Sequence, residues 1–259
     1  RHIPQLLEGQ PLSILTVGRT GAGKSSFNNV LLGFKHDEGP FKPGAGVDGT
    51  TLEVQVEEGF LWGDKKKIPL RVIDTQGYED SKEKNDATIM AKMVDALKKK
   101  KAIFHVILFV RSAEDPRMAN SEKEFLKLII KEFGPEAIVN MMINFSHYPH
   151  SREDYRRRKE LHLPEVKEDG TLNFNESKGA DLVKILLGFW RHLHGGQDVD
   201  HECPLPHFAL DVMYEEDDED EVRDLATEKA LIEVAFKVAM NVMRLPPGQR
   251  QLTAWVKPT

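Results

Sequence analysis

Short apolar runs alternate with amphipathic stretches along most of the chain. Continuous apolar and β-branched residues predict buried strands at 12–17, 68–73, 103–110, 137–143 and 206–210. Apolar residues at helical spacing predict helices at 25–32, 86–101, 121–133, 181–194 and 222–243. Residues 52–56 alternate apolar and polar side chains, as an edge strand does. Strands that alternate with helices predict an α/β fold, with a mainly parallel sheet covered by helices on both faces.

A glycine-rich loop follows directly on the first predicted strand and precedes a predicted helix. Residues 18–25 read G-R-T-G-A-G-K-S, which matches the phosphate-binding pattern G-x-x-x-x-G-K-S. The glycines lack a Cβ, so backbone N–H groups can approach phosphate oxygens closely. The Lys24 ammonium can reach the β- and γ-phosphates, and the Ser25 hydroxyl can bind Mg²⁺. This context favours a three-layer P-loop NTPase fold over a chance match in a glycine-rich turn.

Two further segments have the features of nucleotide sensors. The Gly- and Pro-rich residues 34–49 end in Thr50-Thr51, where a switch threonine would contact Mg²⁺ and the γ-phosphate. Thr51 is the first choice and Thr50 the second, and the alternative is a turn threonine that caps the next strand. The strand at 68–73 runs into Asp74-Thr75-Gln76-Gly77, a D-x-x-G sequence. Asp74 is expected to hold Mg²⁺ through water, and the Gly77 N–H to meet the γ-phosphate.

The segment that would read the base is less regular. Asn144-Phe145-Ser146-His147 follows the strand at 137–143, where most GTP-binding proteins carry N/T-K-x-D. His147 is expected to stack on the base, with a surface-loop histidine as the alternative, and Glu153 or Asp154 could supply a carboxylate. Residues 78–85 are expected to form a polar second switch. Tyr78 stands in the slot where small signalling GTPases carry a water-orienting Gln, so intrinsic hydrolysis should be slow.

Composition excludes several classes of protein. A net charge of −6 gives no support to nucleic-acid binding, which requires a basic surface. A single cysteine, Cys203, rules out an internal disulfide and fits a reducing, cytoplasmic location. The longest apolar run, 102–110, is about half of what a membrane-spanning helix needs. Attachment to an organelle membrane would therefore require segments outside this sequence. Seven consecutive acidic residues at 215–221 predict a solvated link.

The motifs at 18–33 (G-R-T-G-A-G-K-S-S-F-N-N-V-L-L-G), 50–56 (T-T-L-E-V-Q-V) and 72–77 (V-I-D-T-Q-G) resemble those of the septin-related GTPases. Within these, the chain is most similar to the immunity-associated GTPases (the GIMAP group) and the chloroplast-import receptor GTPases. The resemblance covers about residues 12–145. It implies guanine nucleotide, Mg²⁺, slow hydrolysis and G domains that dimerise or oligomerise in the GTP state. It also implies base contact by Ser146-His147, although the family usually has Pro where Gln76 stands.

The expected organisation is a single G domain over residues 1–259, with a core at 12–243, a closing helix at 222–243 and a tail at 244–259. The residues expected to bind nucleotide are Arg19, Thr20, Gly21, Ala22, Gly23, Lys24, Ser25, Ser26, Thr50, Asp74 and His147. Those expected to bind Mg²⁺ are Ser25, Thr51 and Asp74, and those expected to act in hydrolysis are Lys24, Thr51, Gln76 and Gly77. Arg19 and Gln76 are also candidates for contacts across a dimer.

These features together predict a slow, Mg²⁺-dependent GTPase that acts as a switch by assembling into homodimers or oligomers. Two alternatives remain open on the sequence. One is a scaffold that holds GTP or GDP with negligible turnover. The other is an ATPase of the same fold, because no N-K-x-D sequence follows the fifth strand.

Overall fold

A six-stranded sheet in the order β2-β3-β1-β4-β5-β8 forms the centre of the molecule. Its strands are β1 (Leu12–Val17), β2 (Val54–Phe60), β3 (Pro69–Thr75), β4 (Val106–Ser112), β5 (Met141–Ser146) and β8 (His207–Phe208). All are parallel except β2, which pairs antiparallel with β3 at the edge. A separate antiparallel pair consists of β6 (Glu165–Val166) and β7 (Leu172–Asn173).

The computed structural model describes residues 3–42, 54–78, 86–115, 119–148, 205–210 and 219–250, with a few isolated residues between 160 and 212. Its helices are α1 (Lys24–Leu31), α2 (Asp86–Lys99), α3 (Asn120–Phe133) and α6 (Glu219–Met243). Short 3-10 helices are η1 (Leu61–Gly63), η2 (Pro135–Asn140) and η3 (Pro247–Gln249). None of the helices in these ranges is both long enough and apolar enough to cross a membrane.

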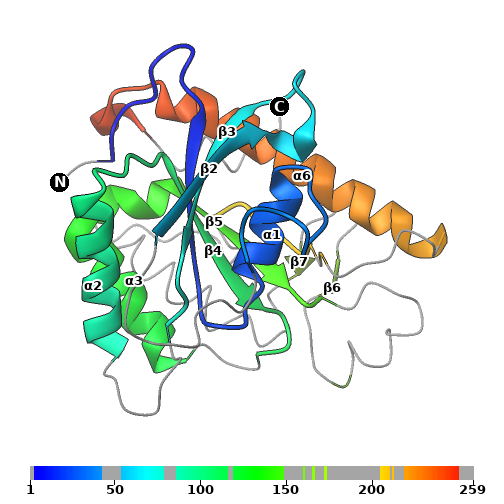
Figure 1. Ribbon diagram of the computed structural model, residues 1–259, viewed down its shortest axis with the longest axis horizontal. Helices are drawn as coiled ribbons and strands as arrows, with labels where there is room; N and C mark the ends of the chain where they lie inside the picture. Colours follow the sequence, from blue (N-terminus) through cyan, green and yellow to red (C-terminus); the bar gives the residue numbers. More distant parts are fainter. Residues whose placement is uncertain are drawn as a thin grey trace.

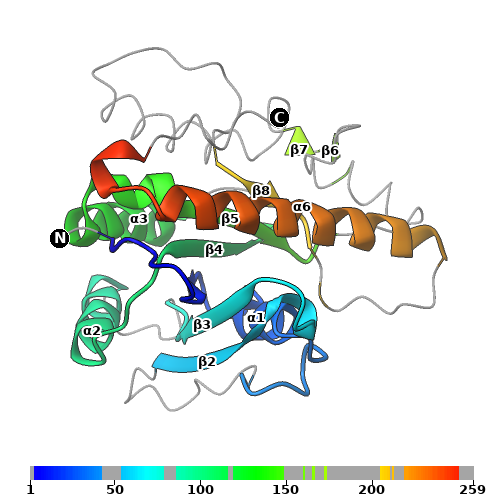
Figure 2. The same cartoon turned by 90° about the horizontal axis from the view of Figure 1, so that it is seen from above.

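The helices form two layers around the sheet. α2 and α3 cover one face, and α1 and α6 cover the other (Figures 1 and 2). Every residue of β1 and β5 is buried, whereas in the edge strand β2 only Val54 is buried. A strand covered on both faces has no solvent side, which is why the central strands are continuous apolar runs. The three-layer α/β P-loop fold predicted from the sequence is confirmed.

Several predicted boundaries were wrong. The strand expected at 137–143 begins only at Met141, because Gly134 and Pro135 end α3 and start η2. The apolar residues at 137–139 are buried in that 3-10 helix instead. The strand expected at 103–110 begins at Val106, and Ile103 is exposed.

The closing helix and the acidic run before it also differ from expectation. α6 begins at Glu219 rather than at residue 222, so the end of the acidic run at 215–221 is helical instead of a link. Acidic side chains in a first helical turn are favoured by the positive end of the helix dipole, which accounts for the earlier start. The helix expected at 181–194 and Cys203 lie outside the described residues.

The sheet topology brings four loops to one edge. β1, β3, β4 and β5 are parallel, so their carboxyl ends point the same way. Those ends lead into the glycine-rich loop, the D-x-x-G segment, the connection to α3, and His147. In open α/β sheets ligands bind at this carboxyl edge.

Candidate functional site

The glycine-rich loop at 18–25 curls between β1 and α1 because its glycines adopt backbone conformations that other residues disfavour. Gly21 and Gly23 have φ of 78° and 80°. A Cβ on Gly18 would lie 2.1 Å from the Val110 carbonyl oxygen, so no side chain fits there. The loop wraps the N-terminus of α1, where backbone N–H groups and the helix dipole favour an anion.

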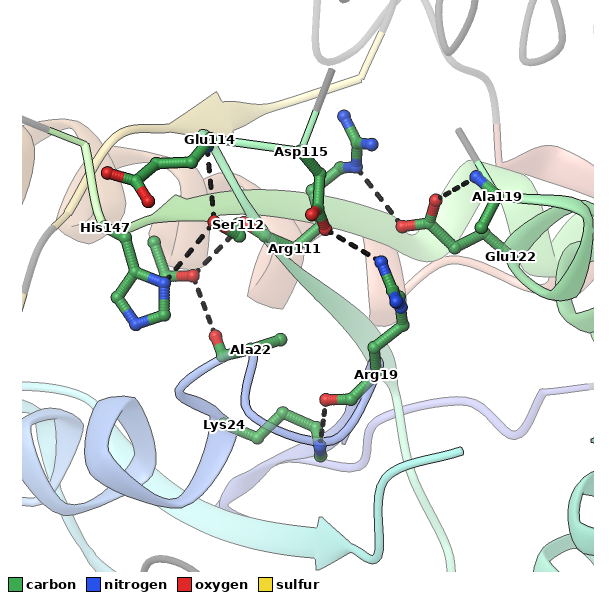
Figure 3. Close-up of polar contacts among 11 residues, drawn as sticks. Arg19, Ala22, Lys24, Arg111, Ser112, Glu114, Asp115, Ala119, Glu122 and His147 are labelled. Atoms are coloured by element: carbon green, nitrogen blue, oxygen red, sulfur yellow. Dashed lines mark hydrogen bonds and ion pairs between the residues drawn. The ribbon is translucent and has the colours of Figure 1, made fainter. Parts of the chain in front are cut away.

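Lys24 places its ammonium inside this loop. The residue is 6% exposed, and its Nζ donates a hydrogen bond of 2.8 Å to the Arg19 carbonyl oxygen (Figure 3). An ammonium is a compact charge on a flexible stem, so it can exchange a carbonyl acceptor for a phosphate oxygen. The loop therefore combines a buried cation with helix N–H donors.

Ser25 and Asp74 bring two oxygen ligands together beside this cation. The Ser25 hydroxyl donates a 2.7 Å hydrogen bond to Asp74 Oδ2. Burial raises the pKa of Asp74, against the opposing effects of the Ser25 hydrogen bond, the Lys24 charge, the Thr75 backbone and Asn28. A hydroxyl and a carboxylate are hard oxygen donors, and Mg²⁺ is usually held by one or two of these together with phosphates and water. The side chains present therefore fit Mg²⁺.

The D-x-x-G segment packs directly on the glycine-rich loop. The Thr20 N–H donates to the Tyr78 carbonyl oxygen at 3.0 Å, and Arg19 and Tyr78 form a β-bridge. A Cβ on Gly77 would lie 2.4 Å from the Thr20 nitrogen, so this approach requires glycine. The Gly77 backbone is thereby held against the loop, and Gln76 next to it is partly exposed.

Tyr78 corrects the prediction of a polar segment at 78–85. It is 3% exposed, and its ring stacks on Phe125 of α3 at a centroid distance of 5.2 Å. An aromatic side chain stabilises the fold by such packing, so Tyr78 belongs to the core rather than to a polar switch. Residues 79–85 lie outside the described ranges.

Arg19 connects the loop to the segment after β4. Its Nη1 lies 3.2 Å from Asp115 Oδ2, and the side chains are 33% and 31% exposed (Figure 3). A second ion pair lies deeper: Arg111 Nε is 3.2 Å from Glu122 Oε1, with 3% and 0% exposure. Glu122 also accepts the Ala119 N–H at the start of α3. The β4–α3 connection is thus tied both to the loop and to the core.

His147 lies on the other side of the loop from Arg19 (Figure 3), and Ser146 directly precedes it in the chain. Ser146 ends β5, is 3% exposed, and donates to the Ala22 carbonyl oxygen at 2.7 Å. His147 has φ of 53°, and its Nδ1 lies 3.4 Å from the Ser112 hydroxyl. His147 is therefore the more accessible of the two beside the loop, while Ser146 anchors β5 to it.

The structure brings together most of the residues expected to form the site. Arg19 to Ser25, Asp74, Gly77 and His147 share one edge of the sheet, and Ser26 is buried in the first turn of α1. Thr50, Thr51, Glu153 and Asp154 lie outside the described residues. Their roles stay predictions.

Asn28 is a site residue that the sequence analysis missed. It is fully buried in α1, accepts a 2.8 Å hydrogen bond from the Thr16 hydroxyl through Oδ1, and donates through Nδ2 to Asp74 Oδ1 at 2.8 Å. Asn is a poor helix former that favours caps and turns, so its presence inside a short helix was a signal. Its partner could not be inferred, since Asp74 is distant in the sequence.

Comparison with known proteins identifies the family. The AIG1 family matches residues 12–162, more than half of the chain. Immune-associated nucleotide-binding protein 7 of Arabidopsis thaliana is 31% identical over 137 residues, which cover 53% of this chain and 41% of that protein. Cell division control protein 10 of Candida albicans is 25% identical over 204 residues, covering 60% of this chain and 55% of that protein. The matched regions thus span about half the length of these relatives.

Solved structures of Toc33 from Arabidopsis thaliana share the fold. The complex with GDP and Mg²⁺ superposes with a TM-score of 0.55 at 18% identity, covering 93% of this chain and 86% of that one. The complex with Mg²⁺ and GMPPNP gives a TM-score of 0.56 at 15% identity and the same coverage. The resemblance expected from the sequence motifs is confirmed. The chain belongs to the AIG1 family, and it shares the P-loop fold of Toc33.

Proposed function

We propose that this protein binds GTP and GDP with Mg²⁺ and hydrolyses GTP slowly, acting as a switch that assembles with itself. The observation that carries the proposal is the convergence of the buried Lys24 ammonium with the Ser25–Asp74 pair at 2.7 Å. The nucleotide-binding relative and the Toc33 complexes with GDP or GMPPNP and Mg²⁺ support the choice of ligand.

Each residue of the site has a distinct role in this proposal. Lys24 neutralises the β- and γ-phosphates, and the loop N–H groups orient them. Ser25 and Asp74 would hold the metal, and Thr51 would join them when GTP is bound. When bound, Mg²⁺ would supply charge neutralisation for the phosphoryl group that is transferred. The Gly77 N–H, held against Thr20, faces the γ-phosphate, and His147 stacks on the base.

Slow turnover follows from the residue after Gly77. The Tyr78 ring is buried against Phe125, so this side chain is used in core packing rather than in orienting a water at the phosphate edge. Gln76, which is partly exposed, is the polar candidate for that role. Without a well-placed group to orient water, phosphoryl transfer depends on positioning and charge alone.

Self-assembly is proposed through the nucleotide edge of the sheet. Arg19 and Asp115 are each about one-third exposed there, so a second copy could reach both. One solved neighbour is a structure in which dimerization is described as important for the GTPase activity of atToc33 and psToc159, and it shares the fold with a TM-score of 0.54 at 16% identity. We propose that the chain acts as one G domain in the cytoplasm, as a homodimer or oligomer.

Two measurements test this function. Phosphate release from Mg²⁺·GTP is followed over about a hundredfold range of protein concentration. A specific rate that rises with concentration supports an assembling GTPase, whereas no release at any concentration identifies a nucleotide-locked scaffold. Competition of GTP and ATP for a fluorescent GDP analogue tests base choice, and displacement by ATP as effective as by GTP would contradict the GTPase assignment.

A further inference from the structure

We propose that Asn28 is a positioning residue that holds Asp74 in the orientation required for Mg²⁺ binding. The inference rests on the proposed function, since it assumes a Mg²⁺·nucleotide complex at Ser25 and Asp74. Asn28 lies one helical turn after Ser25 on α1, so both side chains reach the same carboxylate. They contact different oxygens: Ser25 Oγ bonds Oδ2, and Asn28 Nδ2 bonds Oδ1.

The contacts of Asn28 fix which end of its amide faces Asp74. The Thr16 hydroxyl donates to Asn28 Oδ1 at 2.8 Å, so the NH₂ group points to the carboxylate. A carboxylate accepts and an amide NH₂ donates, so this is the orientation that satisfies both groups. Thr16 is itself fully buried on β1, next to β3 in the sheet. The relay Thr16–Asn28–Asp74 therefore joins β1, α1 and β3 below the loop.

This relay matters because the Ser25 hydroxyl now donates a hydrogen bond to Asp74, and that contact changes when the same oxygen coordinates a metal. When the Ser25 oxygen coordinates Mg²⁺, its contact with Asp74 must adjust, whereas the Asn28 hydrogen bond to Oδ1 can persist. Partners that orient a metal-binding carboxylate from behind are worth about 10–100-fold in metal affinity. Asn28 leaves Oδ2 directed toward the metal or its water.

The neighbouring Asn29 provides a matched control. It too is fully buried on α1, but its side chain bonds the loop that follows the helix. Asn29 Nδ2 donates to the His36 and Phe41 carbonyl oxygens at 2.9 and 2.8 Å, and Oδ1 accepts the Phe41 N–H at 3.0 Å. Replacing either asparagine by alanine removes one buried amide from the same helix, and only Asn28 contacts Asp74.

The test is the gain in GDP affinity that Mg²⁺ provides, measured by titrating the full chain with a fluorescent GDP in Mg²⁺ or in EDTA. GDP is used because it avoids any contribution of Thr51 through the γ-phosphate. Asn28→Ala is expected to lower this gain by about tenfold or more, with affinity in EDTA little changed. Asn29→Ala is expected to keep the wild-type gain, although both variants unfold at lower urea concentration.

A second variant keeps the proposal testable if Asn28→Ala does not fold. Thr16→Val preserves shape but removes the hydroxyl that orients the amide, and it should lower the gain by about threefold, the value of one hydrogen bond. In the double variant with Asn28→Ala the two losses should not add, because they interrupt one relay.

The outcomes separate the inference from the proposed function. A wild-type chain that binds no GDP, or binds it equally with and without Mg²⁺, contradicts the proposed function itself. If Asn28→Ala folds and Mg²⁺ still raises its GDP affinity as much as in the wild type, the positioning role alone is overturned. If Asn28→Ala does not fold, the same result in Thr16→Val overturns it. An equal reduction of the Mg²⁺-dependent gain in Asn28→Ala and Asn29→Ala also overturns it, because the effect would then come from destabilisation of α1 as a whole.

Discussion

At the residue scale, buried polar side chains form the framework of the site. Asp74 is held by Ser25 and Asn28, and Ser146 joins β5 to the Ala22 carbonyl. Each of these groups is buried or partly buried and pairs with a donor or acceptor from a different element. A buried polar group without a partner costs about 1–3 kcal/mol, so such pairings fix the relative positions of the elements that carry them.

A buried histidine at the opposite end of the sheet predicts sensitivity to acid. His105 is 2% exposed, and its Nδ1 accepts the Ser13 N–H at 3.0 Å. Burial, with smaller effects of the Arg250 and Arg71 charges, lowers the pKa of His105 to about 4. Between that value and the ordinary pKa of about 6.5, the unfolded chain binds a proton that the folded chain excludes. The free energy of unfolding therefore falls as pH falls through this window.

Protonation of His105 in the unfolded chain should lower the free energy of unfolding by about 3 kcal/mol between pH 7 and pH 4. His105→Asn retains an acceptor for the Ser13 N–H but does not titrate. Urea unfolding of both proteins at several pH values should show that the free energy of unfolding falls less between pH 7 and pH 4 in the variant than in the wild type, whatever the variant's stability at pH 7. Parallel pH profiles would show that His105 is not the responsible group.

At the element scale, two of the glutamate ion pairs of α3 differ strongly in burial. Glu122 pairs with Arg111 in the core, whereas Glu124 pairs with Lys127 at 2.7 Å on the surface, with 61% and 59% exposure. Breaking a buried pair leaves an uncompensated charge, whereas an exposed pair is screened by water. The two glutamates therefore form an internal comparison within one helix.

Glu122→Ala should destabilise the protein by about 3–5 kcal/mol, and Glu124→Ala by less than about 1 kcal/mol. The loss at Glu122 includes its hydrogen bond with the Ala119 N–H, which caps the first turn of α3. Chemical denaturation of the two variants measures the difference. Similar losses in both would mean that Arg111 finds another partner when Glu122 is removed.

The same scale shows what the sequence could and could not predict. β1 and β3 were predicted closely because buried parallel strands are unbroken apolar runs. β5 was misplaced because the apolar residues of η2 lie just before it, and hydrophobicity alone does not distinguish a buried 3-10 turn from a strand.

The candidate site shows a parallel limit. Lys24, Ser25 and Asp74 were predictable because their motifs have fixed local spacing. Asn28 and the Arg19–Asp115 pair were not, because each depends on a partner that only the sheet topology brings near. Tyr78 was misassigned because its polar hydroxyl and charged neighbours concealed the packing of its ring on Phe125.

At the scale of the whole molecule, contacts near the two ends of the described chain join the segment before β1 to the end of α6 and to Arg250 beyond it. The Arg250 guanidinium donates to the Ile3 and Pro4 carbonyl oxygens at 3.1 Å each, and the Leu6 N–H donates to the Met243 carbonyl oxygen at 2.8 Å. Farther along α6, Glu228 accepts the Ala209 N–H at 2.8 Å, just after β8. The helix that covers one face is thus attached at several points, none of which belongs to the glycine-rich loop.

The central claim is that the loop at 18–25 binds the phosphates of a Mg²⁺·GTP complex through Lys24. Calorimetric titration of the full chain with a non-hydrolysable GTP analogue and Mg²⁺ tests it, using Lys24→Ala and, as a control, the exposed Lys127→Ala of α3. We expect wild type and Lys127→Ala to bind alike, and Lys24→Ala to lose at least about 30-fold in affinity, the cost of removing a buried charge partner. Binding by a folded Lys24→Ala that equals the wild type would contradict the account.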